Sequence, residues 1–170
     1  MKNLIHKSRS LAYLLRHTTY PDRKAWARVP IMLEELGITQ ETFMQIIASD
    51  LKGRFELSDD NLFVRALYGH SIDVDLGLQP TVPPAILYHG TAEKSVQSIM
   101  EKGLEPKSRK YVHLSETVET AIEVGARHGE PVVLSIDTVS MVKDGYKFYK
   151  AQRGVWLIDG VPLEYIKCGV

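Results

Sequence analysis

The chain has 170 residues, with 21 basic and 21 acidic side chains and therefore no formal net charge at pH 7. This balance excludes nucleic-acid recognition through a globally positive surface, so any such binding must come from a local patch. The single cysteine, Cys168, excludes an internal disulfide and is typical of a reducing compartment, and no apolar run is long enough to span a membrane. We therefore expect a cytoplasmic protein of one domain or two small lobes.

The first half of the chain has the pattern of three helices and a hairpin. Apolar residues recur at helical spacing over residues 2–17, and Arg16 and His17 fall in the last turn of this predicted helix, where positive charge favours the helix dipole. A loop is predicted over residues 18–28, and a short helix over 31–36 that ends at Gly37. A third helix is predicted after the N-cap Thr39. Its apolar residues are expected to face inward: Phe43, Met44, Ile46 and Ile47.

Two short apolar runs, 55–57 and 62–64, flank a Ser-Asp-Asp-Asn turn and predict a hairpin. Three helices and a hairpin are typical of a winged helix, a common nucleic-acid-binding arrangement. Three prolines within residues 79–84 predict a stiff linker. The expected lobes are therefore 1–78 and 85–170, joined by the linker 79–84.

The second half alternates short strands and short helices. Strands are predicted over 85–89, 111–114, 132–136, 146–149, 155–158 and 165–168, and helices over 94–102 and 115–124. This alternation predicts an α+β lobe rather than a doubly wound sheet.

Two of these predicted strands end in a histidine followed by small or hydroxyl residues, at His89-Gly90-Thr91 and at His113-Leu114-Ser115. Such strand ends are expected to put an imidazole and a hydroxyl at the rim of a sheet, where ligands bind. A helix-borne Arg127 adds a fork of donors that matches phosphate oxygens. The chain has no glycine-rich dinucleotide or P-loop motif, no metal-ligand spacing and no nucleophile elbow. These residues predict an anion site formed by the two lobes, and they do not name the reaction.

The order of the motifs closely resembles the NAD-dependent RNA 2'-phosphotransferase family. The motifs that carry the resemblance are Leu15-Arg16-His17, Val64-Arg65-Ala66, Gly69-His70-Ser71, Leu87-Tyr88-His89-Gly90-Thr91, Val112-His113-Leu114-Ser115, Val124-Gly125-Ala126-Arg127-His128-Gly129 and Gly154-Val155-Trp156-Leu157. Together they cover residues 8–166. Two positions depart from the family pattern: Tyr68, where glutamine is frequent, and Tyr111, where histidine is common.

The resemblance implies an α+β protein with an N-terminal winged-helix RNA-binding lobe and a C-terminal ADP-ribosyltransferase-like NAD lobe. It implies that an internal RNA 2'-phosphate attacks NAD and expels nicotinamide, and that the resulting RNA-2'-phospho-ADP-ribose is then resolved to 2'-hydroxyl RNA and ADP-ribose 1'',2''-cyclic phosphate. NAD is the co-substrate, and no metal, membrane or obligate protein partner is implied. The implied catalytic residues are Arg16, His17, Arg65 and Arg127. The implied NAD contacts are His89, Gly90, Thr91, His113 and Ser115, and the implied RNA contacts are Gly69, His70 and Ser71.

Two other readings stand beside this one. The first is ADP-ribosyl transfer onto a terminal nucleic-acid phosphate or another acceptor, which would end after the first step. The second is a non-catalytic winged-helix RNA-binding module. Arg65 and Arg127, which we assign to the second step, argue against the former, and the zero net charge argues against the latter.

Overall fold

The computed structural model describes residues 2–169 and divides the chain into two compact units, Met1–Gly77 and Leu78–Val170. Both combine helices with antiparallel sheets, which makes the fold class α+β. Each unit has its own hydrophobic core. No helix within the described residues combines the length and the apolar character needed to cross a membrane.

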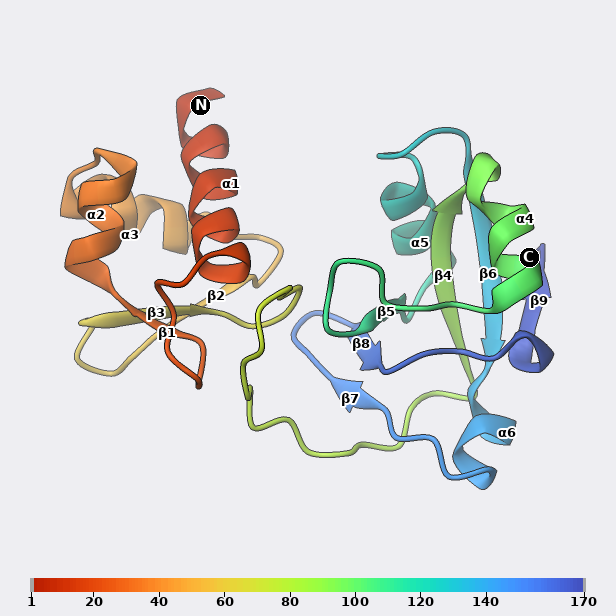
Figure 1. The fold of residues 1–170 in the computed structure, drawn as a ribbon. Helices are drawn as coiled ribbons and strands as arrows, with labels where there is room; N and C mark the ends of the chain where they lie inside the picture. Colours follow the sequence, from red (N-terminus) through yellow and green to blue (C-terminus); the bar gives the residue numbers. More distant parts are fainter. Residues whose placement is uncertain (1, 170) are drawn as a thin grey trace. The chain divides into compact units, whose positions relative to one another are not determined.

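The first unit packs three helices on one face of a small sheet (Figure 1). Its elements are α1 (Lys2–His17), β1 (Trp26–Arg28), α2 (Val29–Leu36), α3 (Gln40–Ala48), β2 (Phe55–Leu57) and β3 (Phe63–Ala66). The strands are antiparallel in the order β1-β3-β2. Alternation along β3 turns Val64 and Ala66 into the core beneath the helices.

Local signals account for the ends of these helices. The predicted helix over 2–17 coincides with α1. Gly37 ends α2 in the left-handed conformation (φ 58°), which glycine adopts without a Cβ penalty. The Thr39 hydroxyl accepts the Thr42 amide at 3.2 Å and caps α3, as predicted. Pro30 lies in the first turn of α2 and lets that helix begin at Val29, two residues before the predicted start.

Two expectations for this unit are corrected. The predicted loop over 18–28 contains β1, which pairs with β3 from Trp26↔Arg65 to Arg28↔Phe63. A three-residue strand has no periodicity of its own, so only its distant partner identifies it. Met44 is 38% exposed rather than inward-facing, because Phe43 and Ile46 already occupy the buried face of α3.

The second unit is built on a six-stranded antiparallel sheet in the order β7-β8-β5-β4-β6-β9. The strands are β4 (Ile86–Ala92), β5 (Val112–Ser115), β6 (Pro131–Asp137), β7 (Tyr149–Lys150), β8 (Val155–Ile158) and β9 (Ile166–Cys168). The helices are α4 (Glu93–Lys102), α5 (Val118–Gly125) and α6 (Thr138–Lys143), with a 3₁₀ turn at Leu163–Tyr165. The sheet core gathers around buried Leu87, Leu114, Leu134 and Trp156.

This sheet consists of two halves that are joined by little pairing. Strand β4 pairs with β6 at seven positions, from Ile86↔Asp137 to Ala92↔Pro131, and β5 pairs with β8 at four. Between β4 and β5 the only paired position in the described residues is Tyr88↔Ser115. Figure 1 shows β5, β8 and β7 turned away from β4, β6 and β9. We call the line between β4 and β5 the seam.

In this unit, too, several elements differ from the predicted ones. The predicted strand over 146–149 is displaced to Tyr149–Lys150, and α6 and the 3₁₀ turn were not predicted. The helix predicted from residue 115 begins at Val118, because Ser115 belongs to β5 and Thr117 is the N-cap. Within residues 79–84, the predicted linker, Pro80 bridges to Tyr149 and the Thr81 amide donates to the Phe148 carbonyl at 2.8 Å.

Candidate functional site

In the first unit, the segment after β3 returns to the C-terminal end of α1. The Ser71 amide donates to the Arg16 carbonyl at 3.0 Å, and the Ser71 hydroxyl lies 2.8 Å from Nδ1 of His17. The neighbouring His70 is only 3% exposed. The structure therefore brings together Arg16, His17 and the 69–71 motif, which are separated by more than fifty positions in sequence.

The Arg16 side chain is held by the two residues that precede His70. Its Cζ lies 5.0 Å from the centroid of the Tyr68 ring, a cation–π contact. Gly69 has φ 88°, and a Cβ at this position would come within 3.2 Å of Arg16 Cζ. The Tyr68 hydroxyl in turn donates to the Lys52 carbonyl at 2.9 Å. Tyr68, a departure from the family pattern, thus serves as a packing surface for the arginine.

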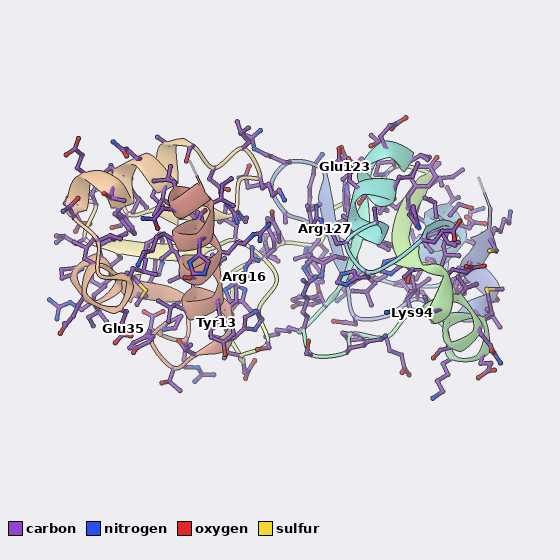
Figure 2. All side chains as sticks on the ribbon, turned by 90° about the horizontal axis from the view of Figure 1, so that it is seen from above. Tyr13, Arg16, Glu35, Lys94, Glu123 and Arg127 are labelled. Atoms are coloured by element: carbon purple, nitrogen blue, oxygen red, sulfur yellow. The ribbon has the colours of Figure 1, made fainter. Side chains whose placement is uncertain are left out.

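A pocket opens beside this cluster on the surface of α1. Its lining contains three arginines and a histidine, and consists of Arg9, Ala12, Tyr13, Arg16, His17 and Arg54. Figure 2 shows Tyr13 and Arg16 on α1, where helical periodicity puts residues 9, 13 and 16 on one face. The pocket is therefore electropositive and suited to an anion.

Arg54 enters this pocket from the loop before β2. Its Nε lies 2.8 Å from Oδ1 of Asp50, and its guanidinium donates to the Ser8 hydroxyl at 2.8 Å. Asp50 also accepts the Arg54 and Phe55 amides, so the carboxylate fixes both the loop and the side chain. Sequence reasoning missed Arg9 and Arg54. The helical spacing of Arg9, Tyr13 and Arg16 could have identified the former.

Arg65 lies on the opposite face of the small sheet from Val64 and Ala66. Pairing places it between Trp26 on β1 and Glu56 on β2. Its Nε donates to Oε2 of Glu56 at 2.5 Å, and its Cζ stands 4.5 Å from the Trp26 ring centroid. These contacts orient the guanidinium and leave its two terminal nitrogens, with four N–H donors, available for an anion. Neither Trp26 nor Glu56 was predicted to support it.

In the second unit, the His89 side chain on β4 forms a hydrogen bond across the seam to β5. His89 lies in the middle of β4, and His113 lies in the middle of β5, so the expectation that both histidines stand at strand ends is wrong. The residues that follow each histidine continue its strand. His89 Nδ1 donates to the His113 carbonyl at 3.0 Å. A carbonyl only accepts, so the proton is on Nδ1, and Nε2 is left as an acceptor.

Burial is the main reason that the pKa of His89 lies below its ordinary value. The positive charge of Lys107 lowers the pKa further, and the hydrogen bond to the His113 carbonyl opposes both effects. His89 therefore remains neutral near neutral pH and keeps its acceptor.

Alternation separates the other predicted NAD contacts between the two faces of the sheet. His89 and Thr91 share the face of buried Leu87, whereas Ser115 is paired with Tyr88 and shares the opposite face with His113. Thr91 and Ser115 are both nearly buried, at 8% and 9% exposure.

The close packing of α5 requires a glycine at position 90, which the sequence alone did not reveal. A Cβ at Gly90 would lie 1.7 Å from the carbonyl oxygen of Ala121 on α5. A Cβ at Gly125 would lie 2.6 Å from the carbonyl oxygen of Thr91. These two glycines therefore let α5 lie directly on the backbone of β4.

Arg127 follows α5 rather than lying on it, which corrects the expectation of a helix-borne arginine. The helix ends at Gly125, and the Arg127 amide donates to the Val124 carbonyl at 3.3 Å in the turn beyond it. Its side chain is exposed (Figure 2). Because Gly125 packs against Thr91, this turn is positioned by the strand that carries His89. Within residues 2–169 no group of three or more His, Cys, Asp or Glu side chains is arranged to hold a metal ion.

Comparison with known proteins gives one consistent result. The family model described as "RNA 2'-phosphotransferase, Tpt1 / KptA family" matches residues 2–160. A protein of Acaryochloris marina is 44% identical over 168 residues, which cover 93% of each chain. A protein of Burkholderia pseudomallei is 42% identical, with 94% of this chain and 92% of the relative covered. One from Fusobacterium nucleatum is 40% identical over 98% and 99%. All three relatives are named probable RNA 2'-phosphotransferase.

Proposed function

Because the chain belongs to the RNA 2'-phosphotransferase family, we propose that it removes an internal 2'-phosphate from RNA by transferring it to NAD. The observation that carries the proposal is the arginine-lined pocket beside the Arg16–His17–Ser71 cluster. Such a group of cations is suited to a phosphate dianion and provides no carboxylate pair for acid–base work.

We propose that Met1–Gly77 is the core of a winged-helix RNA-binding lobe, expected over 1–78. Its three helices and three-stranded antiparallel sheet support this assignment. We propose that residues 85–170 form an ADP-ribosyltransferase-like NAD lobe, with 79–84 as the connection. The divided sheet supports this second assignment, because a seam with one paired position leaves most of the facing backbone groups of β4 and β5 outside the ladder.

In the first step, an oxygen of the RNA 2'-phosphate attacks the anomeric carbon of the nicotinamide ribose, and the carbon–nitrogen bond to nicotinamide breaks. Nicotinamide is already cationic in NAD and leaves as a neutral molecule, so this step needs placement more than proton transfer. Arg16 and His17 would hold the phosphate, and the Ser71 hydroxyl would orient the imidazole from Nδ1. Gly69 and His70 would shape the RNA contact around them.

In the second step, the 2''-hydroxyl of the ADP-ribose attacks the phosphorus, and the bond from phosphorus to the RNA 2'-oxygen breaks. The RNA oxygen gains a proton, and the phosphate remains on ADP-ribose as the 1'',2''-cyclic phosphate. Negative charge increases on the phosphoryl oxygens in the transition state, and preorganised arginines stabilise it. We assign this role to Arg65 and Arg127.

NAD binding would depend on the seam. The neutral His89 presents Nε2 as an acceptor for a ribose hydroxyl. Thr91, His113 and Ser115 would add contacts from side chain or backbone on the two strands. Gly90 would contribute its backbone, although its lack of a side chain is already explained by α5.

The decisive experiment incubates the protein with a 5'-labelled oligonucleotide that carries one internal 2'-phosphate, with and without NAD. The expected products are the 2'-hydroxyl oligonucleotide, nicotinamide and ADP-ribose cyclic phosphate, all dependent on NAD. The same oligonucleotide without the 2'-phosphate is the control. An ADP-ribosylated RNA that never proceeds to product would support transfer that ends after the first step. Phosphate release without NAD would contradict the proposal.

A further inference from the structure

The pocket on α1 is longer than the contact that a single phosphate needs. Arg9 and Arg16 are seven residues apart on the same helix, which corresponds to about 10 Å along its axis. Arg16 and His17 occupy the end at Ser71, and Arg9 lies at the other end. A 2'-phosphate held at the first end would leave the second end to another anion.

The positive charge at the Arg9 end is not balanced within the unit. Arg54 is paired with Asp50, but the exposed Arg9 side chain forms no ion pair or hydrogen bond with any residue of the described chain, 2–169. Exposed arginines without partners are common on protein surfaces. Here, however, the arginine lines a pocket together with a second arginine, Arg54, whose side chain is held in place by Ser8 and Asp50.

We propose that Arg9 and Arg54 form a second phosphate subsite, which binds one backbone phosphodiester next to the 2'-phosphate. The inference rests on the proposed function and adds that the protein recognises the 2'-phosphate as part of a chain, rather than as an isolated phosphate monoester. A phosphodiester is the expected occupant because each nucleotide of an RNA chain carries one beside its ribose. The diphosphate of NAD has the same chemistry, and the experiment separates the two sources.

The test pairs two enzymes with two substrates. One oligonucleotide carries an internal 2'-phosphate and ordinary linkages, and a second replaces the linkages on both sides of that nucleotide with uncharged methylphosphonates. For the unmodified protein, kcat/KM should fall about tenfold on the uncharged substrate, the low end for a lost charged hydrogen bond. Arg9→Ala should be about tenfold slower than the unmodified protein on the ordinary RNA and should no longer distinguish the two substrates. Substrates with a single methylphosphonate identify which linkage is bound.

Three variants complete the design. Arg9→Lys keeps the charge and should recover part of the discrimination. Arg23→Ala removes another exposed arginine of the same unit outside the pocket and should behave as the unmodified protein. For Arg54→Ala, thermal unfolding is measured together with kcat/KM, because this substitution also removes the hydrogen-bond donor to Asp50 and Ser8.

Each other result overturns a defined part of the reasoning. An unchanged ratio of kcat/KM between the two RNAs in Arg9→Ala would overturn the subsite whatever the overall loss of activity, because partial misfolding lowers kcat/KM equally on both RNAs and does not itself change their ratio. A raised KM for NAD in Arg9→Ala, with the RNA ratio intact, would assign the pocket to the NAD diphosphate instead. Complete inactivity of the unmodified protein on the ordinary RNA with NAD would overturn the proposed function and the subsite with it. Activity without discrimination would overturn the subsite alone.

Discussion

Replacing Arg65 with alanine should make the second step slower than the first, so that RNA-2'-phospho-ADP-ribose accumulates. The attacking phosphate donates electrons in step one, and a cation bound to it lowers its nucleophilicity. In step two the same phosphate gains negative charge, and the cation lowers the barrier directly. Arg65 fits this role because Glu56 occupies only its Nε, and the four N–H donors on its terminal nitrogens remain.

The expected effects of Arg65→Ala on the rate of step two and on folding stability follow from the contacts of this side chain. Loss of a preorganised donor of this kind costs about 2.7–4 kcal/mol in the transition state, or roughly 10²–10³ in rate. The cost to folding is smaller. The ion pair with Glu56 is part-exposed and contributes at most about 1 kcal/mol. The contact with Trp26 adds about 0.5–1 kcal/mol. Their sum is below the roughly 5–15 kcal/mol that stabilises a typical domain, so the variant should remain folded.

The assay is a single-turnover time course with end-labelled 2'-phosphorylated RNA, which resolves substrate, intermediate and product. Arg65→Ala and Arg127→Ala should accumulate the intermediate, whereas Arg16→Ala should delay its appearance by loosening the grip on the 2'-phosphate. Glu56→Gln is the matched control: it removes the partner but keeps the arginine, and it should slow step two by less than about tenfold. If Arg65→Ala loses activity with no intermediate at any time, Arg65 acts in binding or in step one.

Three further outcomes are expected. Because the net charge is zero, the log–log salt dependence of RNA affinity should be shallower than about −4, and a steeper slope would mean more phosphate contacts than the pocket supplies. Gly90→Ala should lower the free energy of unfolding by at least about 1–3 kcal/mol in urea titration, since its Cβ would meet the Ala121 carbonyl at 1.7 Å, and a stability like that of the unmodified protein would contradict this packing. Burial lowers the pKa of His89 below its ordinary value of 6.5. As the pH falls below 6.5, the unfolded chain therefore takes up a proton at this histidine before the folded chain does. Stability should therefore be complete above that pH and decline below it. His89→Asn should flatten the decline in Tm, whereas His6→Asn, an exposed control, should retain it.

Much of the local structure could be predicted from the residues alone. The end of α2 at Gly37 and the cap of α3 at Thr39 depend on backbone and side-chain preferences within a few positions. The run over 2–17 carries a helical apolar periodicity and residues 155–158 form an unbroken apolar run, and both elements were predicted with their observed bounds. The motif order also sufficed to identify the family, because it requires only the sequence.

Tertiary structure alone decided the features that depend on distant partners. Strand β1 has no signal of its own until β3 pairs with it. The position of His89 within a strand follows from the seven pairs that β6 makes with β4, which extend the strand beyond the apolar run. Arg54 became part of the pocket because Asp50 and Ser8 hold it beside α1, and Arg65 acquired Glu56 and Trp26 through strand pairing. Sequence patterns depend on residues within about one helical turn or one strand, whereas these contacts join residues that only the folded chain brings together.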